Sequence, residues 1–305
     1  MSTERRIWKH HSRIKLRLLK RYLYMCTTIY PTGFQYFETH GGEGRILFDD
    51  GVEEDGSALI AATNRKQIKC VIMEYNSENI TKLREILPFE RFPNVIILQG
   101  DSNLEIDQIL KNIDNYKFSL GFIDPDSPKQ LKWETIIKIS NHSYLRQKDN
   151  FLRKPELIIN FPIEGIKRNA GFLDNPVPKA NSYCDINTEF FGSDEWKDIW
   201  RKTKKDIVKS REELLNFYIN NLRKLYKFVI PLVFVESIAN HPLYYVISCS
   251  QHDLGNEFLL KVKTDIEQWK NEDWVRQYYK VHSLMDFVND TKESDGKMQS
   301  SLFDY

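Results

Sequence analysis

Three residues near position 40 have the types and spacing of a nucleoside-binding loop. Glu38 ends a strand-like run, 34–37, and Gly42 and Gly44 follow it after four and six positions. Glycine has no Cβ and takes positive φ at little cost, so the backbone N–H groups of such a loop can approach a ligand closely. Glycine loops also serve as plain turns, so the pattern alone does not decide between a turn and a cofactor site.

The strands expected after this loop also end in polar side chains. Four further runs are typical of buried strands, and the polar residues at their carboxyl ends are Glu74, Asp101, Asp124 and Asn160. Ligands of open parallel sheets bind in the crevice beyond the carboxyl ends of the strands, so we interpret these side chains as parts of one site. Taken singly, Asp101 and Asp126 also fit the roles of a helix N-cap and a turn residue.

This arrangement resembles that of class I S-adenosylmethionine-dependent methyltransferases. The resemblance implies that the cofactor is bound by residues of the loop and the strand ends, namely Glu38, His40, Gly41, Gly42, Gly44, Glu74, Asp101 and Asp124. The loop would hold the methionine end, Glu74 the ribose and Asp101 the adenine amino group. His40 would contact a substrate or simply fill the turn. Asp124, nearest to the methyl acceptor, and Asn160 are the candidate catalytic residues.

The order of the predicted elements gives the fold class. Strands and helices alternate, which is typical of an α/β protein with a mostly parallel sheet and helices on both faces. The last two predicted strands, 227–235 and 243–249, are separated by a turn too short for a crossover helix, so we expect them to pair antiparallel. We therefore expect a Rossmann-like class I methyltransferase fold with seven strands and an antiparallel C-terminal hairpin.

A closer resemblance, to the three-Cys-motif partner proteins (TcmP), extends over nearly the whole chain. The segments that carry it are Trp8 with the helix Lys15–Tyr24, Glu38–Arg45, Gly56–Ala61, Ile123–Pro125, Trp133–Ile136, Ile159–Phe161 with Arg168 and Asn169, Phe191 and Gly192 with Trp196, and Leu243–Tyr245. The resemblance implies an intracellular protein with a methyltransferase-like fold that pairs with a separate three-cysteine-motif protein. That partner's family is similar to iron–sulfur repair lyases.

Two features depart from the pattern of that family. The family has an aspartate at the end of its first strand, where this chain has the longer Glu38. The segment 46–55, which carries five acids, lies between the glycine loop and the helix expected to start near Ser57. This segment puts the contribution of the helix N-terminus to the site in question. It also lengthens the interval to Glu74 beyond the usual ~20 residues.

No motif identifies the methyl acceptor. Methylation of an exocyclic amine of a base typically uses an Asp/Asn-Pro-Pro-aromatic loop, and the run 124–127, Asp-Pro-Asp-Ser, lacks the second proline and the aromatic. Carbon methylation of cytosine needs a thiolate that usually follows a proline, and none of the four cysteines follows one. The run 160–162 fits either a base-stacking site or a strand end with a proline stop. Loss of methyl transfer therefore stays an alternative.

Composition limits the classes of protein that remain. The 305 residues, 41% hydrophobic and 13% aromatic, suffice for a full core. No apolar run reaches the ~18 residues of a membrane span, and the first residues lack the apolar region of a signal peptide. The four scattered cysteines fit neither a zinc site nor a disulfide framework. We therefore expect a cytoplasmic protein with no metal site and no membrane association.

Basic residues are concentrated in an N-terminal unit, residues 1–30, although the net charge of the chain is only +1. The helix of this unit combines an apolar stripe with a basic face, which fits either contact with nucleic-acid phosphates or an ordinary solvated surface. Arg168 likewise fits either an anion site or a surface ion pair. The candidate nucleic-acid-binding residues are Arg13, Lys15, Arg17, Lys20, Arg21 and Arg168.

Residues 289–305 are expected to form a flexible polar tail after a methyltransferase-like domain, 31–288, that has a helical insertion around 171–210. The tail ends in a motif that resembles the peptide with which replication and repair proteins bind the sliding clamp. Its residues are Gln299, Leu302, Phe303 and Tyr305. The glutamine would fill a small polar pocket of the clamp, and the leucine with an aromatic ring would fill an apolar one. The alternative is a tail that covers its own domain.

Two functions of different classes stay open. The first is a methyltransferase that uses S-adenosylmethionine, acts on nucleic acid in DNA repair or processing and is recruited by the clamp. The second is a catalytically inactive protein of the same fold, which joins the three-cysteine-motif repair protein to DNA or to the clamp. Cofactor binding separates the two.

Overall fold

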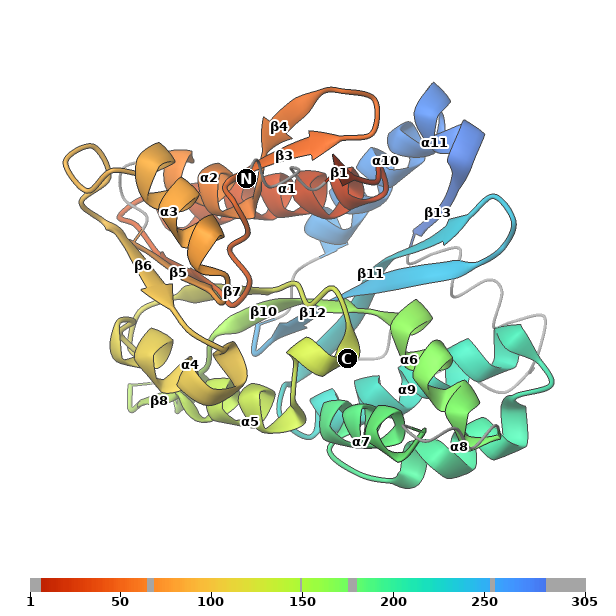
Figure 1. Ribbon diagram of the computed structural model, residues 1–305. Helices are drawn as coiled ribbons and strands as arrows, with labels where there is room; N and C mark the ends of the chain where they lie inside the picture. Colours follow the sequence, from red (N-terminus) through yellow and green to blue (C-terminus); the bar gives the residue numbers. More distant parts are fainter. Residues whose placement is uncertain (1–6, 65–68, 149, 175–179, 253–255, 284–305) are drawn as a thin grey trace.

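The computed structural model describes residues 7–64, 69–148, 150–174, 180–252 and 256–283. A mixed sheet lies at the centre of the molecule, with helices on both faces (Figure 1). Within the described ranges the sheet has eight strands in the order β13-β11-β12-β10-β7-β2-β5-β6. Their bounds are β2 (Gln35–Glu38), β5 (Lys69–Glu74), β6 (Val95–Gln99), β7 (Ser119–Ile123), β10 (Glu156–Phe161), β11 (Phe228–Ser237), β12 (Pro242–Ser250) and β13 (Tyr279–Ser283).

The strands of this sheet that lie between residues 35 and 161 form its parallel part. β2 lies between β5 and β7 and is parallel to both, with Glu38 in register with Ile72 and Phe122. β6 is parallel to β5, and β10 is parallel to β7. β12 is antiparallel to β10 and to β11, and β13 is antiparallel to β11. The carboxyl ends of β2, β5, β7 and β10 therefore meet at one edge of the sheet.

The expected number of seven strands is wrong by one. β13 adds an eighth strand at the edge, where Val281 is in register with Val235 of β11. This segment follows the helix α11 (Asp273–Tyr278) with no residue between the two elements. The sequence therefore lacks the turn signals that usually separate a strand from a helix.

Helices of two layers cover the sheet. The described helices of one face are α1 (Ser12–Ile29), α2 (Ser57–Thr63), α3 (Ser77–Ile86), α10 (Asn256–Lys270) and α11, and those of the other face are α4 (Ser102–Lys111), α5 (Trp133–Asn141), α6 (Ile163–Ala170), α7 (Ala180–Phe191), α8 (Glu195–Thr203) and α9 (Ile207–Arg223). Adjacent side chains of β2 point to opposite layers, Tyr36 to the first and Phe37 to the second. No helix in the described ranges is long and apolar enough to cross a membrane.

Shorter elements lie around these layers. The 3₁₀ turns are η1 (Pro128–Gln130) and η2 (Gly171–Leu173), and the strands of the small sheets are β1 (Ile7–Trp8), β3 (Arg45–Phe48) and β4 (Glu53–Asp55), then β8 (Tyr144–Arg146) and β9 (Phe151–Arg153). β1 is parallel to β3, and β3 is antiparallel to β4. The segment 46–55 that the sequence sets apart is therefore a hairpin that lies over α1 (Figure 1).

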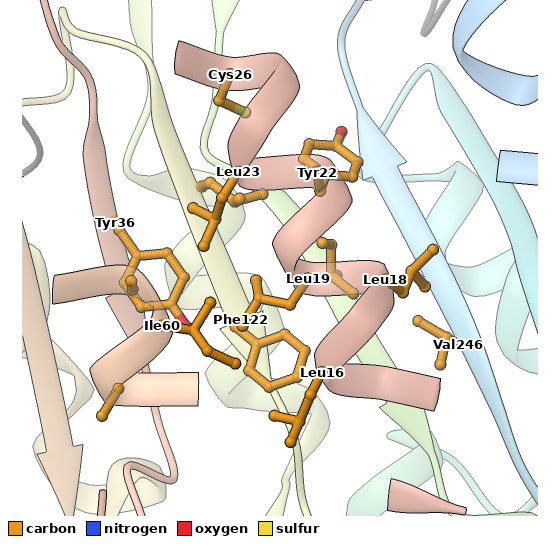
Figure 2. Close-up of a cluster of buried hydrophobic side chains, with 14 of the residues drawn as sticks. Leu16, Leu18, Leu19, Tyr22, Leu23, Cys26, Tyr36, Ile60, Phe122 and Val246 are labelled. Carbon is orange, nitrogen blue, oxygen red and sulfur yellow. The ribbon is translucent and has the colours of Figure 1, made fainter. Parts of the chain in front are cut away.

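The apolar stripe expected for the N-terminal helix packs onto the sheet. Leu16, Leu19 and Leu23 of α1 are buried in one cluster with Phe122 of β7 and Ile60 of α2 (Figure 2). Burial of a leucine side chain stabilises a fold by roughly 1.5–3 kcal/mol. The helix is thus part of the same core as the sheet.

Gly121 tests how tightly the central strand β7 is packed. A Cβ at this position would lie 2.4 Å from Phe37 Cζ and 2.8 Å from Leu157 Cδ2. We expect Gly121→Ala to lower the free energy of unfolding by about 1–3 kcal/mol, because the added methyl group overfills the core. Urea unfolding of the variant and the wild type measures this difference.

Gly171→Ala is the matched control. Within the described residues no atom lies within 4 Å of a Cβ placed at Gly171, and its φ of −59° suits any residue. We expect this variant to be as stable as the wild type or slightly more stable, because alanine reduces the entropy of the unfolded chain. Equal losses in both variants would contradict the packing described for β7.

Candidate functional site

The glycine loop that follows β2 lies directly against β5. Gly42 and Gly44 have φ values of +63° and +83°, which favour glycine. The N–H of Gly41 donates to Met73 O at 2.9 Å, and a Cβ on Gly41 would lie 2.4 Å from Ile72 Cγ2. The three glycines are therefore required by the turn and by the close approach of the loop to β5.

The hairpin formed by β3 and β4 starts directly after the glycine loop, and its last residue contacts the loop again. The N–H of Gly56, at the end of the hairpin, donates to Gly44 O at 2.8 Å, and a Cβ on Gly56 would lie 3.0 Å from that oxygen. α2 starts at the next residue, Ser57, beside the loop. The segment 46–55 therefore closes on itself and leaves the start of α2 beside the glycine loop.

Glu74 joins the glycine loop to the end of β5. Its Oε2 accepts from the N–H of Gly42 at 2.7 Å, and its Oε1 accepts from the N–H of Asn76 at 2.8 Å. Asn76 in turn caps α3, because its side chain accepts from the N–H groups of Glu78 and Asn79. The carboxylate of Glu74 is thus held in one orientation at the edge of the sheet.

A cavity of about 300 Å³ lies between these loops, at the carboxyl ends of β2, β5 and β7. The residues that line it are Trp8, Ser12, Lys15, Leu16, His40–Gly44, Ile46, Gly56, Ser57, Glu74–Asn76, Asn79, Asp124, Asp126 and Gln130. Among the described residues, four carboxylates, those of Glu43, Glu74, Asp124 and Asp126, and one lysine belong to this lining. We call this space the loop cavity. Acids therefore predominate among the charged residues of its lining.

Glu38, the last residue of β2, is fully buried. Tyr36 donates its hydroxyl to Oε2 at 3.0 Å, while Oε1 is buried and has no hydrogen-bond partner within the described part of the chain. Burial raises the pKa of Glu38 to about 8, although the hydroxyls of Ser57 and Tyr36 act in the opposite direction. Glu38 is therefore mostly protonated at neutral pH.

His40 and Asp124 are fixed by neighbouring elements. His40 Nδ1 lies 2.7 Å from Thr39 Oγ1, and its Nε2 lies 3.3 Å from Gln130 O. Burial lowers the pKa of His40, so its imidazole is neutral at pH 7. Asp124, at the end of β7, accepts from Lys15 Nζ at 2.5 Å. The loop cavity thus contains a neutral histidine and a paired lysine.

The structure brings most of the predicted cofactor residues together but leaves others apart. His40, Gly41, Gly42, Gly44, Glu74 and Asp124 line the loop cavity, whereas Glu38 is fully buried and is not among the lining residues. Asp101 is not among the lining residues, and its side chain caps α4 by accepting from the N–H of Asn103 at 2.8 Å. Asn160 lines a second cavity next to the first.

The basic residues of α1 do not form the open basic face that the sequence indicates. Arg13 and Lys15 are 5% and 6% exposed, and they pair with Glu54 and Asp124 at 2.6 Å and 2.5 Å. Arg17 pairs with Glu272 at 2.5 Å, and Arg21 pairs with Asp265. Their acidic partners lie 41 to 255 positions away in the chain. The alternation of charge along a helix does not reveal such partners. Contact of these residues with nucleic acid stays a prediction.

Lys20 and Arg168 are exposed. The clamp-like motif formed by Gln299, Leu302, Phe303 and Tyr305 lies outside the described residues. Neither observation tests the roles predicted from the sequence.

Several lining residues were not predicted. Tyr75 follows Glu74 directly and is 76% exposed at the rim of the loop cavity, so its position after the strand end was a usable signal. Trp8 and Ser12 reach the cavity from the N-terminal segment, and Ser57 reaches it through the closed hairpin. No local pattern marks these three, because long-range packing brings them there.

Comparison with family models and with curated protein sequences finds no match. Among solved structures, the Legionella pneumophila protein LPL1258, of family model DUF519, is 14% identical over 88% of this chain and 94% of its own, with a TM-score of 0.49. A putative caffeoyl-CoA O-methyltransferase from Staphylococcus aureus is 12% identical over 78% of this chain and 83% of its own, with a TM-score of 0.39. Cofactor-bound Rv0187 from MTB is 12% identical over 78% and 81%, with a TM-score of 0.41. At these identities, activity has to be inferred from the residues of this chain.

The buried carboxyl group of Glu38 predicts a pH dependence of stability. Its pKa is about 8 in the folded chain, whereas the ordinary value for a glutamate, which applies to the unfolded chain, is 4.5. The folded chain therefore holds a proton that the unfolded chain releases between these values. Stability falls as pH rises through this window, by a few kcal/mol. We expect Glu38→Gln, which cannot ionise, to gain stability relative to the wild type by that amount between pH 5 and pH 8.5.

Urea unfolding of both proteins at the two pH values measures this gain. The control is Glu78→Gln, because Glu78 is an exposed residue of α3. The stability of that variant relative to the wild type should be unchanged by pH. Parallel curves for Glu38→Gln and the wild type would show that Glu38 ionises normally and would contradict the assignment.

Proposed function

We propose that this chain binds S-adenosylmethionine in the loop cavity and is a class I methyltransferase-like protein. The observation that carries the proposal is an acidic cavity beside a glycine loop at the carboxyl edge of a mostly parallel sheet. Glycine loops at this edge suit nucleoside-bearing ligands. Of the four described lining carboxylates, two are paired with lysines, Asp124 with Lys15 and Glu43 with Lys82, both at 2.5 Å. Acids still outnumber bases in this lining, which favours a ligand with positive charge over a chain of phosphates. S-adenosylmethionine combines an adenosine with a sulfonium and an ammonium group.

The lining residues fit this ligand group by group. The carboxylate of Glu74 has about four acceptor sites, of which the N–H groups of Gly42 and Asn76 use two. The remaining sites face the ribose hydroxyls in our proposal. The exposed ring of Tyr75 at the rim is suited to lie against the adenine. Asp101 as the partner of the adenine amino group remains a proposal from the sequence.

The methionine end is assigned to the glycine loop, which follows Glu38. Glu38 Oε1 is a buried carboxyl oxygen with no hydrogen-bond partner in the described residues. A cation close to this carboxyl group would favour its ionised form. When bound, S-adenosylmethionine supplies a methyl group on a positively charged sulfur.

Isothermal titration of the purified chain with S-adenosylmethionine and S-adenosylhomocysteine tests the proposal. We expect micromolar binding by the wild type. Glu74→Ala should weaken it at least tenfold, about 1.4 kcal/mol, because the variant loses the ribose acceptor and the anchor of the loop. ATP, which carries phosphates on the same adenosine, should bind at least a hundredfold more weakly than S-adenosylmethionine.

Two further variants complete this experiment. Glu85→Ala removes an exposed carboxylate of α3 outside the cavity and should bind as the wild type does. Asp101→Ala distinguishes two roles of Asp101. If its side chain binds the adenine amino group, as the sequence predicts, the affinity for S-adenosylmethionine falls. If it only caps α4, as the geometry indicates, the affinity equals that of the wild type. The absence of heat with both ligands, or ATP binding as tight as that of S-adenosylmethionine, would overturn the proposal. The first of these results would favour the inactive adapter.

The finer functional proposals come from the sequence alone. We propose that the tail docks on a sliding clamp and that the chain pairs with a three-cysteine-motif protein of the kind implied by the TcmP resemblance. Action on nucleic acid in DNA repair is proposed on the same ground. The sequence Gln299-Ser300-Ser301-Leu302-Phe303-Asp304-Tyr305 supports the first of these.

Surface plasmon resonance of the full chain on the sliding clamp of the same organism tests the tail. We expect Leu302→Ala to reduce clamp affinity at least tenfold, because the leucine would fill the apolar pocket. Asp304→Ala changes a position outside the motif and should retain wild-type affinity. An equal effect of both variants, or no binding by the wild type, would refute clamp docking through this motif.

A further inference from the structure

A second cavity of about 210 Å³ adjoins the loop cavity. Trp8, Ser12, Lys15 and Asp126 line both spaces. The other lining residues of the second cavity are Ile7, Lys9, His11, Asn160, Pro162, Glu164, Leu243 and Tyr244. It therefore extends from the loop cavity towards the ends of β10 and β12. Ligand pockets usually measure roughly 300–1,000 Å³, so this space suits a single ring system.

Asn160 is part of the lining of this cavity and carries a buried hydrogen-bond acceptor that no described residue uses. The residue is 4% exposed, and its Nδ2 donates to Pro125 O at 2.9 Å. A carbonyl accepts only from the NH₂ group, so this bond fixes the orientation of the amide. Asn160 Oδ1 is then left buried, with no partner within the described ranges. An unpaired buried acceptor costs about 1–3 kcal/mol, which a donor from a ligand would offset.

His11 adds a second unpaired nitrogen. Its Nδ1 is buried and has no hydrogen-bond partner in the described part of the chain. Burial, together with the charge of Lys15, lowers the pKa of His11 to about 4. The imidazole is therefore neutral at pH 7, and in one of its two tautomers Nδ1 accepts a hydrogen bond. Asn160 and His11 line the same cavity, so an NH₂ group bound there has two candidate acceptors for its two hydrogens.

The lining of the cavity is partly aromatic and partly aliphatic. Trp8 and Tyr244 are aromatic, and Pro162 and Leu243 are aliphatic. The hydroxyl of Tyr244 donates to His11 O at 2.5 Å, which holds the ring in place. Among the described residues, the lining also holds two carboxylates, those of Asp126 and Glu164, and two lysines. Both lysines are paired with aspartates, Lys9 with Asp49 at 3.3 Å and Lys15 with Asp124 at 2.5 Å, so these residues offer no excess of positive charge to an anion.

We infer that the second cavity binds the methyl acceptor and that this acceptor is a planar ring with a primary amino group, held by Asn160 Oδ1. The inference rests on the proposed function, because the shared wall places the acceptor beside the methyl donor. The nitrogen lone pair forms the new C–N bond while the C–S bond breaks and leaves a thioether. One N–H proton passes to water.

The bases that line the cavity bear on whether the methyl acceptor is a nitrogen or an oxygen atom. An amino nitrogen keeps its lone pair while it bears hydrogens, so it needs no base before it reacts. A hydroxyl oxygen is a weak nucleophile until a base removes its proton. His11 has a pKa of about 4 and is a poor base at neutral pH. Removal of a hydroxyl proton would therefore depend on the lining carboxylates, Asp126 and Glu164, whereas an amine reacts without a base.

Binding of three purines to the full chain, saturated with S-adenosylhomocysteine so that the adenine site of the loop cavity is occupied, tests the inference. The probes are adenine, which carries an amino group at position 6, purine, which carries hydrogen there, and hypoxanthine, which carries oxygen. We expect adenine to bind at least tenfold more tightly than the other two by isothermal titration. Asn160→Ala should remove this preference and leave the affinity for S-adenosylhomocysteine unchanged.

The outcomes separate this inference from the proposed function. If S-adenosylhomocysteine does not bind the wild type, the proposed function fails. If S-adenosylhomocysteine binds but the protein binds adenine no more tightly than purine, only the inference about the methyl acceptor is overturned. Equal weakening of adenine and purine by Asn160→Ala would also overturn it, because the amide would then act on packing alone. If Asn160→Ala does not fold, the comparison of the three purines on the wild type decides.

Discussion

The carboxylate of Glu74 is the interaction on which the arrangement of the site depends. It lies at the end of a buried strand and is 8% exposed, yet both oxygens accept from backbone N–H groups at 2.7 Å and 2.8 Å. These bonds tie the glycine loop after β2 to the turn before α3. A buried charge that lost them would cost several kcal/mol. The loop therefore keeps one conformation, with its backbone placed around the loop cavity.

α1 plays the corresponding role on the other side of this cavity. Its leucines pack on the sheet, and its basic side chains pair with parts of the chain that are distant in sequence. Arg13 reaches the hairpin at Glu54, Lys15 reaches the end of β7, and Arg21 reaches Asp265 of α10. The helix thus joins the hairpin, the sheet edge and the C-terminal helix. Its charges contribute to the fold, and Lys15 also lines both cavities.

The outline of the fold could be predicted because its signals are local. Buried strand runs with polar residues at their ends indicate a parallel sheet, and these ends do meet in the structure. The eighth strand, β13, was missed because α11 runs into it without a turn. The closure of the hairpin was missed for another reason. A hydrogen bond between Gly56 and Gly44 joins residues whose relation depends on the strand pairing between them.

The difference between local signals and long-range pairing also explains which site residues were predicted correctly. Residues next to a strand end or in the loop, such as His40 and Glu74, line the cavity. Asp101 is also next to a strand end, but β6 lies at the edge of the sheet, and the side chain caps α4. Whether a residue at a strand end lines the cavity depends on where its strand lies in the sheet. That position is a property of the whole sheet and cannot be read from the sequence near the residue.

The ion pair of Lys15 and Asp124 also bears on which residue orients the proposed methyl acceptor. Asp124 stands where the sequence places the catalytic group, but Lys15 Nζ already donates to its Oδ1 at 2.5 Å. This pairing neutralises the lysine next to the proposed site of a sulfonium, which lowers the electrostatic cost of bringing two cations together. A carboxylate in that role is less available to orient an amine. Asn160 is uncharged, and Pro125 fixes its amide. It can accept a hydrogen bond without disturbing the ion pair, so a division of roles between the two residues follows from the geometry.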